Sequence, residues 1–270
     1  MACTQLTGCS YFPQKEDFSK VISGEASQEA KVLENELQQM REEVADYFYY
    51  QQLDTDEERR VYLQLANGLR TFKQQITIDR VDDETYTRAF FSVANDFPEY
   101  YWMTDAMRDG IDYQDLSEPD YPLQVEEESE KIATLAQSIV SQAPKDHVYD
   151  TVKFFYEYII QHTDYNLAAL SDSQISWDNQ SIKSVLLANS SVCAGYSRTF
   201  QYLCKLAGIE AVYVSGNVTG TNGETIEHAW NLVKIDQQYY GVDSTWGDPV
   251  FEEAMGSQVQ STISYDYLCV

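Results

Sequence analysis

The residues Ser191-Val192-Cys193-Ala194-Gly195-Tyr196-Ser197-Arg198 open a run in which apolar side chains recur every three or four positions, as far as Gly208. This spacing predicts a helix that stops at the glycine. Cys193 then lies in the first turn, where free backbone N–H groups and the helix dipole favour a thiolate. The N–H groups of this turn, including that of Ala194, are candidate oxyanion donors. Ala194 and Gly195 are also expected to keep the approach to the sulfur open.

Two strand-like runs follow the predicted helix. Residues 226–235 and 238–243 are rich in residues that favour strands, and the polar pair Asp236-Gln237 separates them. A two-residue hairpin turn at this pair would place Asp243 opposite Trp230, with His228 as its diagonal neighbour on the same face. A three-residue loop would turn Asp243 to the other face. The contact between Asp243 and His228 therefore depends on the register of this hairpin.

Cysteine, histidine and aspartate are the residue types of a thiol-based catalytic triad. The histidine serves as general base and acid, and the carboxylate fixes its tautomer. Cys193, His228 and Asp243 occur in that order, each in distinctive flanking sequence. The sequence therefore predicts an acyl-transfer enzyme with these three residues at its centre.

The flanking sequences resemble the transglutaminase-like superfamily, and its bacterial branch most closely. The matching segments are Val192-Cys193-Ala194-Gly195-Tyr196-Ser197, Gly208-Ile209, His228-Ala229-Trp230-Asn231 and Val242-Asp243-Ser244-Thr245-Trp246-Gly247-Asp248-Pro249. The resemblance covers roughly the last half of the chain. It implies a papain-like core in which Cys193 is the nucleophile, His228 the general base and acid, and Asp243 the orienting carboxylate.

The resemblance leaves the second oxyanion donor unassigned. Papain-type proteases carry a glutamine six residues ahead of the nucleophile, and Leu187 stands at that position here. Animal transglutaminases use an upstream tryptophan, for which Trp177 is the nearby candidate. Together with Ala194, the residues Trp177, Trp230 and Trp246 are therefore the candidates for contact with the substrate or the oxyanion.

Three classes of function fit these motifs. The first is a transglutaminase, which forms a thioester with a glutamine side chain and resolves it with a lysine amine or water. Its partners would be proteins that bear glutamine and lysine. The second is a cysteine peptidase or amidase that uses the same triad. The third is a non-catalytic cell-surface module. The acidic surface favours the first class, because it would concentrate amine acceptors.

The composition excludes several other classes of protein. The net charge of −26 makes nucleic acid a poor partner, because phosphate binding needs a basic patch. The sequence shows no glycine-rich phosphate loop, no calcium-loop pattern and no zinc-ligand spacing around His147 or His162. No cofactor and no metal are therefore expected. The oligomeric state cannot be read from the sequence.

The first residues suggest lipid attachment. Leu6-Thr7-Gly8-Cys9 resembles the site at which bacterial lipoproteins are cleaved and lipidated, and Cys3 is a second candidate. Two cysteines in a flexible start are the alternative interpretation. Lipidation would tether the protein to a membrane at an extracellular or cell-surface location.

The fold class expected is α+β. Residues 1–22 are expected to form a flexible tether, 23–145 a helical domain, and 146–270 a core in which the nucleophile helix packs on an antiparallel sheet. Helices are predicted at 26–53, after Asp54 and after Asp82. The aromatic segment 95–102 is interpreted as an interdomain packing plug, with a wall of the substrate cleft as the alternative.

Overall fold

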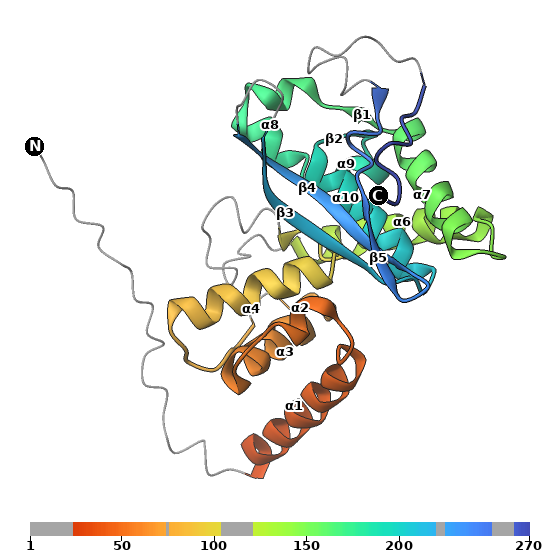
Figure 1. The fold of residues 1–270 in the computed structure, drawn as a ribbon. Helices are drawn as coiled ribbons and strands as arrows, with labels where there is room; N and C mark the ends of the chain where they lie inside the picture. Colours follow the sequence, from red (N-terminus) through yellow and green to blue (C-terminus); the bar gives the residue numbers. More distant parts are fainter. Residues whose placement is uncertain (1–23, 74–75, 104–120, 220–224, 250–261) are drawn as a thin grey trace, which may run out of the picture.

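The computed structural model describes residues 24–73, 76–103, 121–219, 225–249 and 262–270. Within them the chain has the predicted α+β fold. Helices α1–α4 gather on one side, and the later helices and the sheet form the other side (Figure 1). We call these parts the helical lobe and the core. The predicted tether and its two cysteines lie outside the described residues, and the predicted domain boundary at residue 145 stays a prediction.

The elements follow one another along the chain in this order. In the helical lobe they are α1 (Gly24–Glu43), α2 (Phe48–Gln51), α3 (Asp56–Arg70) and α4 (Asp83–Asp96). The core begins with the helices α6 (Tyr121–Gln142) and α7 (Val148–His162). It continues with β1 (Asp164–Tyr165), η2 (Leu167–Leu170), α8 (Ser173–Asp178), α9 (Ile182–Leu186) and β2 (Ser190–Ser191). It ends with α10 (Cys193–Leu206), β3 (Ala211–Thr219), β4 (Thr225–Ile235) and β5 (Gln238–Val242).

The caps of α3 and α4 form as their sequences predict. Thr55 and Glu58 make a reciprocal capping box at the start of α3, and Asp82 accepts a hydrogen bond from the backbone of Thr85 at the start of α4. Each cap supplies a partner for N–H groups that have no acceptor inside the helix.

The single helix predicted at 26–53 is wrong, because the chain breaks between α1 and α2. The cause is a carboxylate distant in sequence. Asp96 accepts hydrogen bonds from the backbone N–H groups of Tyr49 (3.0 Å) and Tyr50 (2.9 Å), and it thereby caps a new helix. The break also changes the face of the chain that is buried. Phe48 is 36% exposed, whereas Tyr50 is buried.

The core is built on a three-stranded antiparallel sheet in the order β3-β4-β5. The turn between β4 and β5 has two residues, Asp236 and Gln237, with φ angles of 49° and 66°. Two left-handed residues in succession are typical of a type I′ hairpin turn. Ile235 consequently pairs with Gln238 and Asn231 with Val242, which is the predicted register.

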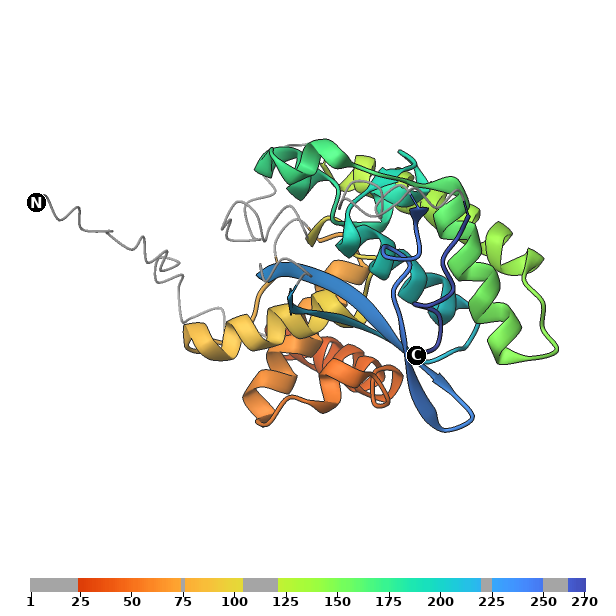
Figure 2. The same cartoon turned by 45° about the horizontal axis from the view of Figure 1, so that its top comes forward.

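Helix α10 packs on this sheet and reaches the helical lobe as well. It contacts β3 and β4, while α6, α7 and α9 pack against it on other sides (Figures 1 and 2). It begins at Cys193 and is followed by Gly208 at φ 71°, as predicted. One continuous cluster of buried apolar residues runs from Leu37 in the helical lobe to Leu268 near the C-terminus.

The aromatic segment between the lobes is buried. Phe97, Tyr100, Tyr101 and Trp102 are each no more than 8% exposed, and the Phe97 and Tyr100 rings stack at 4.7 Å. This matches the packing-plug interpretation, since side chains so deeply buried cannot line an open cleft.

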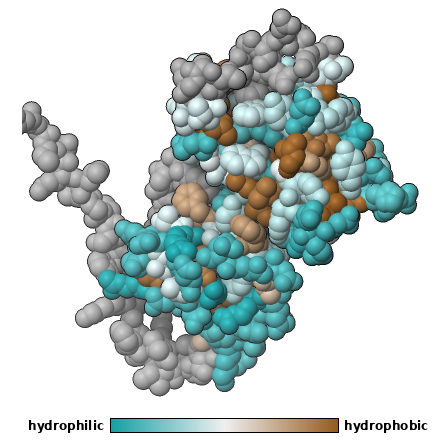
Figure 3. All heavy atoms as spheres, viewed as in Figure 1, coloured by the Kyte–Doolittle hydropathy of each residue, from teal (hydrophilic) through white to brown (hydrophobic). Residues whose placement is uncertain are grey.

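The molecular surface differs between the two parts. In the view of Figure 3 the helical lobe is mostly hydrophilic, and apolar residues gather over the sheet side of the core. None of the helices among the described residues is long and apolar enough to cross a membrane.

Candidate active site

Cys193 is the first residue of α10, as the sequence predicts. Val192 precedes it in an extended conformation and provides no side-chain acceptor for the N–H groups of the first turn. The thiol is half-buried and forms no disulfide. The unsatisfied N–H groups and the helix dipole therefore produce a positive electrostatic potential at the sulfur and at any oxygen beside it.

His228 on β4 lies between Cys193 and Asp243. Its Nε2 lies 2.6 Å from Oδ2 of Asp243, and the ring also interacts with the Cys193 side chain. Because Asp243 contacts Nε2, Nδ1 is the ring nitrogen left for the sulfur. The structure thus brings together the three residues that the sequence predicts, in the order sulfur, imidazole, carboxylate.

Electrostatics at His228 favour the protonated ring. Burial lowers the pKa of His228, but hydrogen bonds and charge interactions with Asp243 and Cys193 outweigh this and raise the pKa to about 9. An imidazolium is thus the favoured form near neutral pH. An imidazolium can donate a proton to a leaving group.

Asp243 is held by the loop that follows it. Its Oδ1 accepts hydrogen bonds from the backbone N–H groups of Thr245 and Trp246, both at 3.0 Å. Its own N–H donates to the carbonyl of Tyr267 at 2.9 Å. The carboxylate therefore has a fixed orientation, with Oδ2 left for the histidine.

The rest of this loop packs against two helices. A Cβ at Gly247 would lie 1.7 Å from the hydroxyl oxygen of Tyr156 on α7, so only glycine fits there. Asp248 is 2% exposed and accepts a 2.7 Å hydrogen bond from Tyr196 on α10. These contacts hold the Asp243 loop relative to the nucleophile helix.

Two of the predicted tryptophans surround the imidazole. Trp246 lies 5.0 Å from His228 between ring centroids, and Trp230 lies 6.1 Å away, both nearly parallel to it. A Cβ at Gly216 would be 3.2 Å from the Trp230 ring, so glycine leaves room for the indole over β3. Both indoles are half-buried and form apolar walls beside the histidine.

Trp177, the third predicted tryptophan, lies on α8 and is half-buried. Its helix borders the nucleophile segment, since the carbonyl of Asn179 accepts a 3.2 Å hydrogen bond from the N–H of Val192. Trp177 itself has no ring contact with the triad among the described residues. Trp177 stays a candidate for contact with the substrate or the oxyanion only because its helix lies near the nucleophile segment.

Gly195 and Ala194 have a different role from the expected one. A Cβ at Gly195 would lie 2.0 Å from the Ser191 hydroxyl and 2.9 Å from the Asn179 carbonyl, so this glycine faces a packed interior. Ala194 is 5% exposed and packs against the sheet at Tyr213 and Ala229. Neither residue therefore keeps an approach to the sulfur open, although the Ala194 N–H stays an oxyanion candidate.

Three residues at the site were missed by sequence reasoning. Tyr165 on β1 and Tyr213 on β3 both lie within electrostatic reach of Cys193. Asn231 donates to the carbonyl of Ser197 on α10 at 3.0 Å and so joins β4 to the nucleophile helix. Only Asn231 had a local signal, because it closes the His228-Ala229-Trp230-Asn231 motif.

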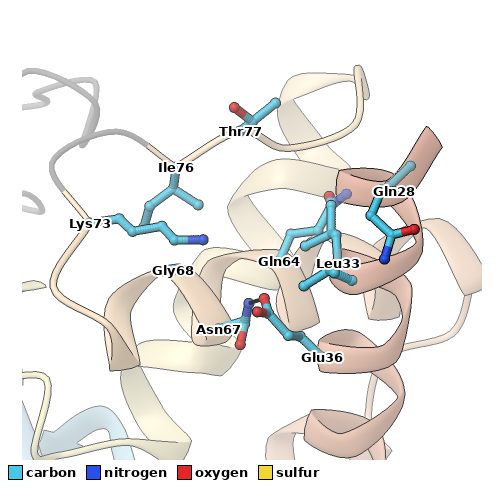
Figure 4. A pocket seen from close by; sticks show the side chains of 11 residues that line it. Gln28, Leu33, Glu36, Gln64, Asn67, Gly68, Lys73, Ile76 and Thr77 are labelled. Carbon is cyan, nitrogen blue, oxygen red and sulfur yellow. Dashed lines mark hydrogen bonds between the residues drawn. The ribbon is translucent and has the colours of Figure 1, made fainter. Parts of the chain in front are cut away.

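A separate hollow lies in the helical lobe. It measures about 530 Å³ between α1, α3 and the segment that contains Lys73, Ile76 and Thr77 (Figure 4). None of the triad residues lines it. Among the described residues no cluster of histidine, cysteine and carboxylates could hold a metal ion.

Part of the chain is similar to a known family. Residues 133–244 match the family described as the transglutaminase-like superfamily. Kyphoscoliosis peptidase of Homo sapiens is 28% identical over 159 residues, which make up 55% of this chain and 23% of that protein. The Mus musculus protein of the same name is 29% identical over 122 residues, or 42% of this chain and 18% of that protein.

The chain thus matches less than a quarter of the length of these curated relatives. A crystal structure described as that of a TGase is similar with a TM-score of 0.41 and 18% identity, over 62% of this chain and 42% of that one. The family match confirms the resemblance that the sequence motifs indicate. The similarity to the transglutaminase-like superfamily therefore covers residues 133–244.

Proposed function

We propose that the protein catalyses acyl transfer through a thioester on Cys193. The observation that supports this is the arrangement at α10: a sulfur on the first helical residue, an imidazole that interacts with it, and a carboxylate 2.6 Å from Nε2 of that imidazole. Each group has the partner that its role requires.

The proposed acylation begins with attack of the Cys193 thiolate on an amide carbonyl carbon. The new C–S bond converts the carbonyl oxygen into an oxyanion, which the N–H groups of the first turn of α10 stabilise. Collapse of this intermediate breaks the C–N bond. His228 donates its proton to the departing nitrogen and becomes neutral.

The proposed second step releases the acyl group. An amine or a water molecule attacks the thioester carbon, and neutral His228 accepts its proton. The C–S bond breaks, and the thiolate and imidazolium are restored. Asp243 stays ionised throughout and stabilises the imidazolium in both steps.

We propose a glutamine side chain as the acyl donor and a lysine amine or water as the acceptor. The net charge of −26 supports an amine acceptor, because an acidic surface raises the local concentration of cations. Peptide-bond hydrolysis is the second candidate, and it is favoured by the similarity to proteins named kyphoscoliosis peptidase. Attachment to a cell surface through an N-terminal lipid would fit either activity.

Incorporation of a fluorescent primary amine into a glutamine-rich protein tests the proposal. Wild-type protein should attach the amine, and Cys193→Ala should not. Cleavage of the same protein without attachment of the amine would assign peptidase activity instead. If neither product forms and iodoacetamide modifies Cys193 no faster than the buried Cys204, the non-catalytic module is the remaining class.

A further inference from the structure

Arg198 lies on α10, five residues beyond the nucleophile, in the interface between the two lobes. It is 7% exposed. Its Nη1 donates to the carbonyl of Ala94 at 2.5 Å, and its Nη2 to Oδ1 of Asn95 at 3.4 Å. Both acceptors lie in the last turn of α4, where the helix dipole is negative. Its Nε is buried without a hydrogen-bond partner.

The hydrogen-bond acceptors of this buried cation are a backbone carbonyl and a side-chain amide, not a carboxylate. The ion pairs found among the described residues do not include Arg198. The side chain is instead placed over an aromatic ring, with Cζ 4.2 Å from the centroid of Tyr213. Burial of a guanidinium without a carboxylate has a cost. A role for Arg198 at the active site would offset this cost with a functional benefit.

Tyr213 connects Arg198 to the nucleophile. The tyrosine is 6% exposed and packs with Ala194 and Ala229 in a small cluster that Cys193 also contacts. The helical lobe fixes its backbone as well, because the hydroxyl of Tyr49 donates to the Tyr213 carbonyl at 2.6 Å. Burial raises the pKa of the Tyr213 phenol, the Arg198 cation opposes this, and the Cys193 sulfur adds to it. The ring thus interacts with both groups.

We propose that Arg198 is a positioning residue, which holds the Tyr213 ring against Cys193. Because α4 of the helical lobe binds Arg198, the helical lobe then contributes to the geometry of the site. The inference rests on the proposed function, because positioning matters only if the sulfur reacts. A ring packed beside Cys193 restricts where the sulfur can point. Small errors in that geometry reduce reaction rates steeply.

A second cation on the same helix provides a matched control. Lys205 also binds the carboxyl end of α4, through the Asp96 carbonyl at 3.2 Å, and it pairs with Oε1 of Glu99 beyond the helix at 2.8 Å. It lies over the rings of Tyr47 and Phe97 rather than over Tyr213. Loss of Lys205 therefore weakens the lobe interface and leaves the contact with Tyr213 intact.

The test compares Arg198→Met, Arg198→Lys and Lys205→Met in the full chain. Two quantities are measured: the rate at which iodoacetamide alkylates Cys193, followed on its peptide by mass spectrometry, and kcat and KM for amine incorporation. Arg198→Met should lower the alkylation rate and kcat by about tenfold, with KM nearly unchanged. Arg198→Lys should recover most of both, because an ammonium can still lie over the ring. Lys205→Met should stay within about twofold of wild type, since it does not touch Tyr213.

Equal effects of Arg198→Met and Lys205→Met, or wild-type rates in Arg198→Met, would overturn the proposal. If Arg198→Met does not fold, Tyr213→Leu replaces it and should show the same tenfold loss of alkylation rate. Failure of the proposed function gives a different pattern. In that case wild-type protein transfers no acyl group, and the alkylation rates alone decide whether Arg198 positions the sulfur.

Discussion

Asp243 uses both carboxylate oxygens, and this makes its amide variant informative. Oδ2 contacts His228, and Oδ1 accepts from the backbone N–H groups of Thr245 and Trp246. An asparagine has one oxygen, so it can keep either the loop or the histidine contact. Asp243→Asn should reduce kcat by about 10²- to 10⁴-fold while the protein stays folded. The exposed Asp266, changed to asparagine, is the matched control. Near-wild-type turnover of Asp243→Asn would remove this residue from the triad.

The protonation of His228 sets the pH range of activity. Its pKa of about 9 lies above the ordinary value of 6.5, so the proton that the leaving nitrogen needs is present at neutral pH and is lost as the pH rises through about 9. We therefore expect kcat for amide donors to fall on the alkaline side, with a midpoint near pH 9. A profile of kcat against pH checks this. A fall centred near pH 6.5 instead would show that Asp243 and Cys193 do not raise the pKa of the ring.

At the scale of single elements, the β4–β5 turn sets the register of the site. Asp236 and Gln237 both adopt left-handed φ angles, which disfavour residues with a Cβ. Gln237→Gly should therefore raise the free energy of unfolding by about 0.5–1 kcal/mol, with kcat unchanged. Urea denaturation measures this. Gln238→Gly, in the extended β5, is the control and should destabilise the fold. Loss of stability in Gln237→Gly would contradict a type I′ turn.

The loop after β5 depends on a close approach of α7. Gly247→Ala would force the new methyl group into the Tyr156 ring, so we expect a loss of about 1–3 kcal/mol in the free energy of unfolding. The kcat should fall as well, since the loop holds Asp243. Chemical denaturation and the amine assay check the two effects. Gly208→Ala is the comparison: its new Cβ meets no neighbour, but its φ angle of 71° is strained for alanine. The two variants therefore separate the cost of a steric clash from the cost of backbone strain. Unchanged stability in Gly247→Ala would show that the loop can move away from α7.

At the scale of the whole molecule, the Asp96 carboxylate joins α2, α3 and α4 and gives the fold a pH dependence. Burial raises the pKa of Asp96 to about 6, although hydrogen bonds from Tyr49, Tyr62 and Tyr50 oppose this. Because the folded pKa exceeds 3.8, its contribution to stability is complete below pH 3.8 and is lost as the pH rises through about 6. Urea denaturation of wild type and Asp96→Asn from pH 4 to 7 should show this decline in wild type alone. Parallel pH dependences would contradict the raised pKa.

The sequence indicates the parts of the fold that depend on local spacing. The start of α10 at Cys193, the stop at Gly208 and the register that joins His228 to Asp243 all follow from nearby residues, and the structure agrees with them. The split between α1 and α2 could not be predicted, because the cap on Tyr49 comes from a carboxylate 47 residues away.

Other features could not be predicted either, because they also depend on contacts between residues that are distant in sequence. The strand β3 contains Gly216, a residue type depleted in strands, and it is tolerated because the Trp230 ring covers it. The two-residue strands β1 and β2 exist only through their pairing. The partners of Arg198 on α4 lie more than 100 residues away in sequence, so no local pattern marks that residue.

The central claim is that one sulfur, on the first residue of α10, forms the covalent intermediate. Mass spectrometry of the intact protein, mixed with a glutamine peptide and no amine and quenched with acid, tests this most directly. We predict an adduct with the mass of the peptide minus ammonia, located on Cys193 by fragmentation and lost in Cys193→Ala. An adduct on another residue, or one that persists in Cys193→Ala, would contradict the assignment.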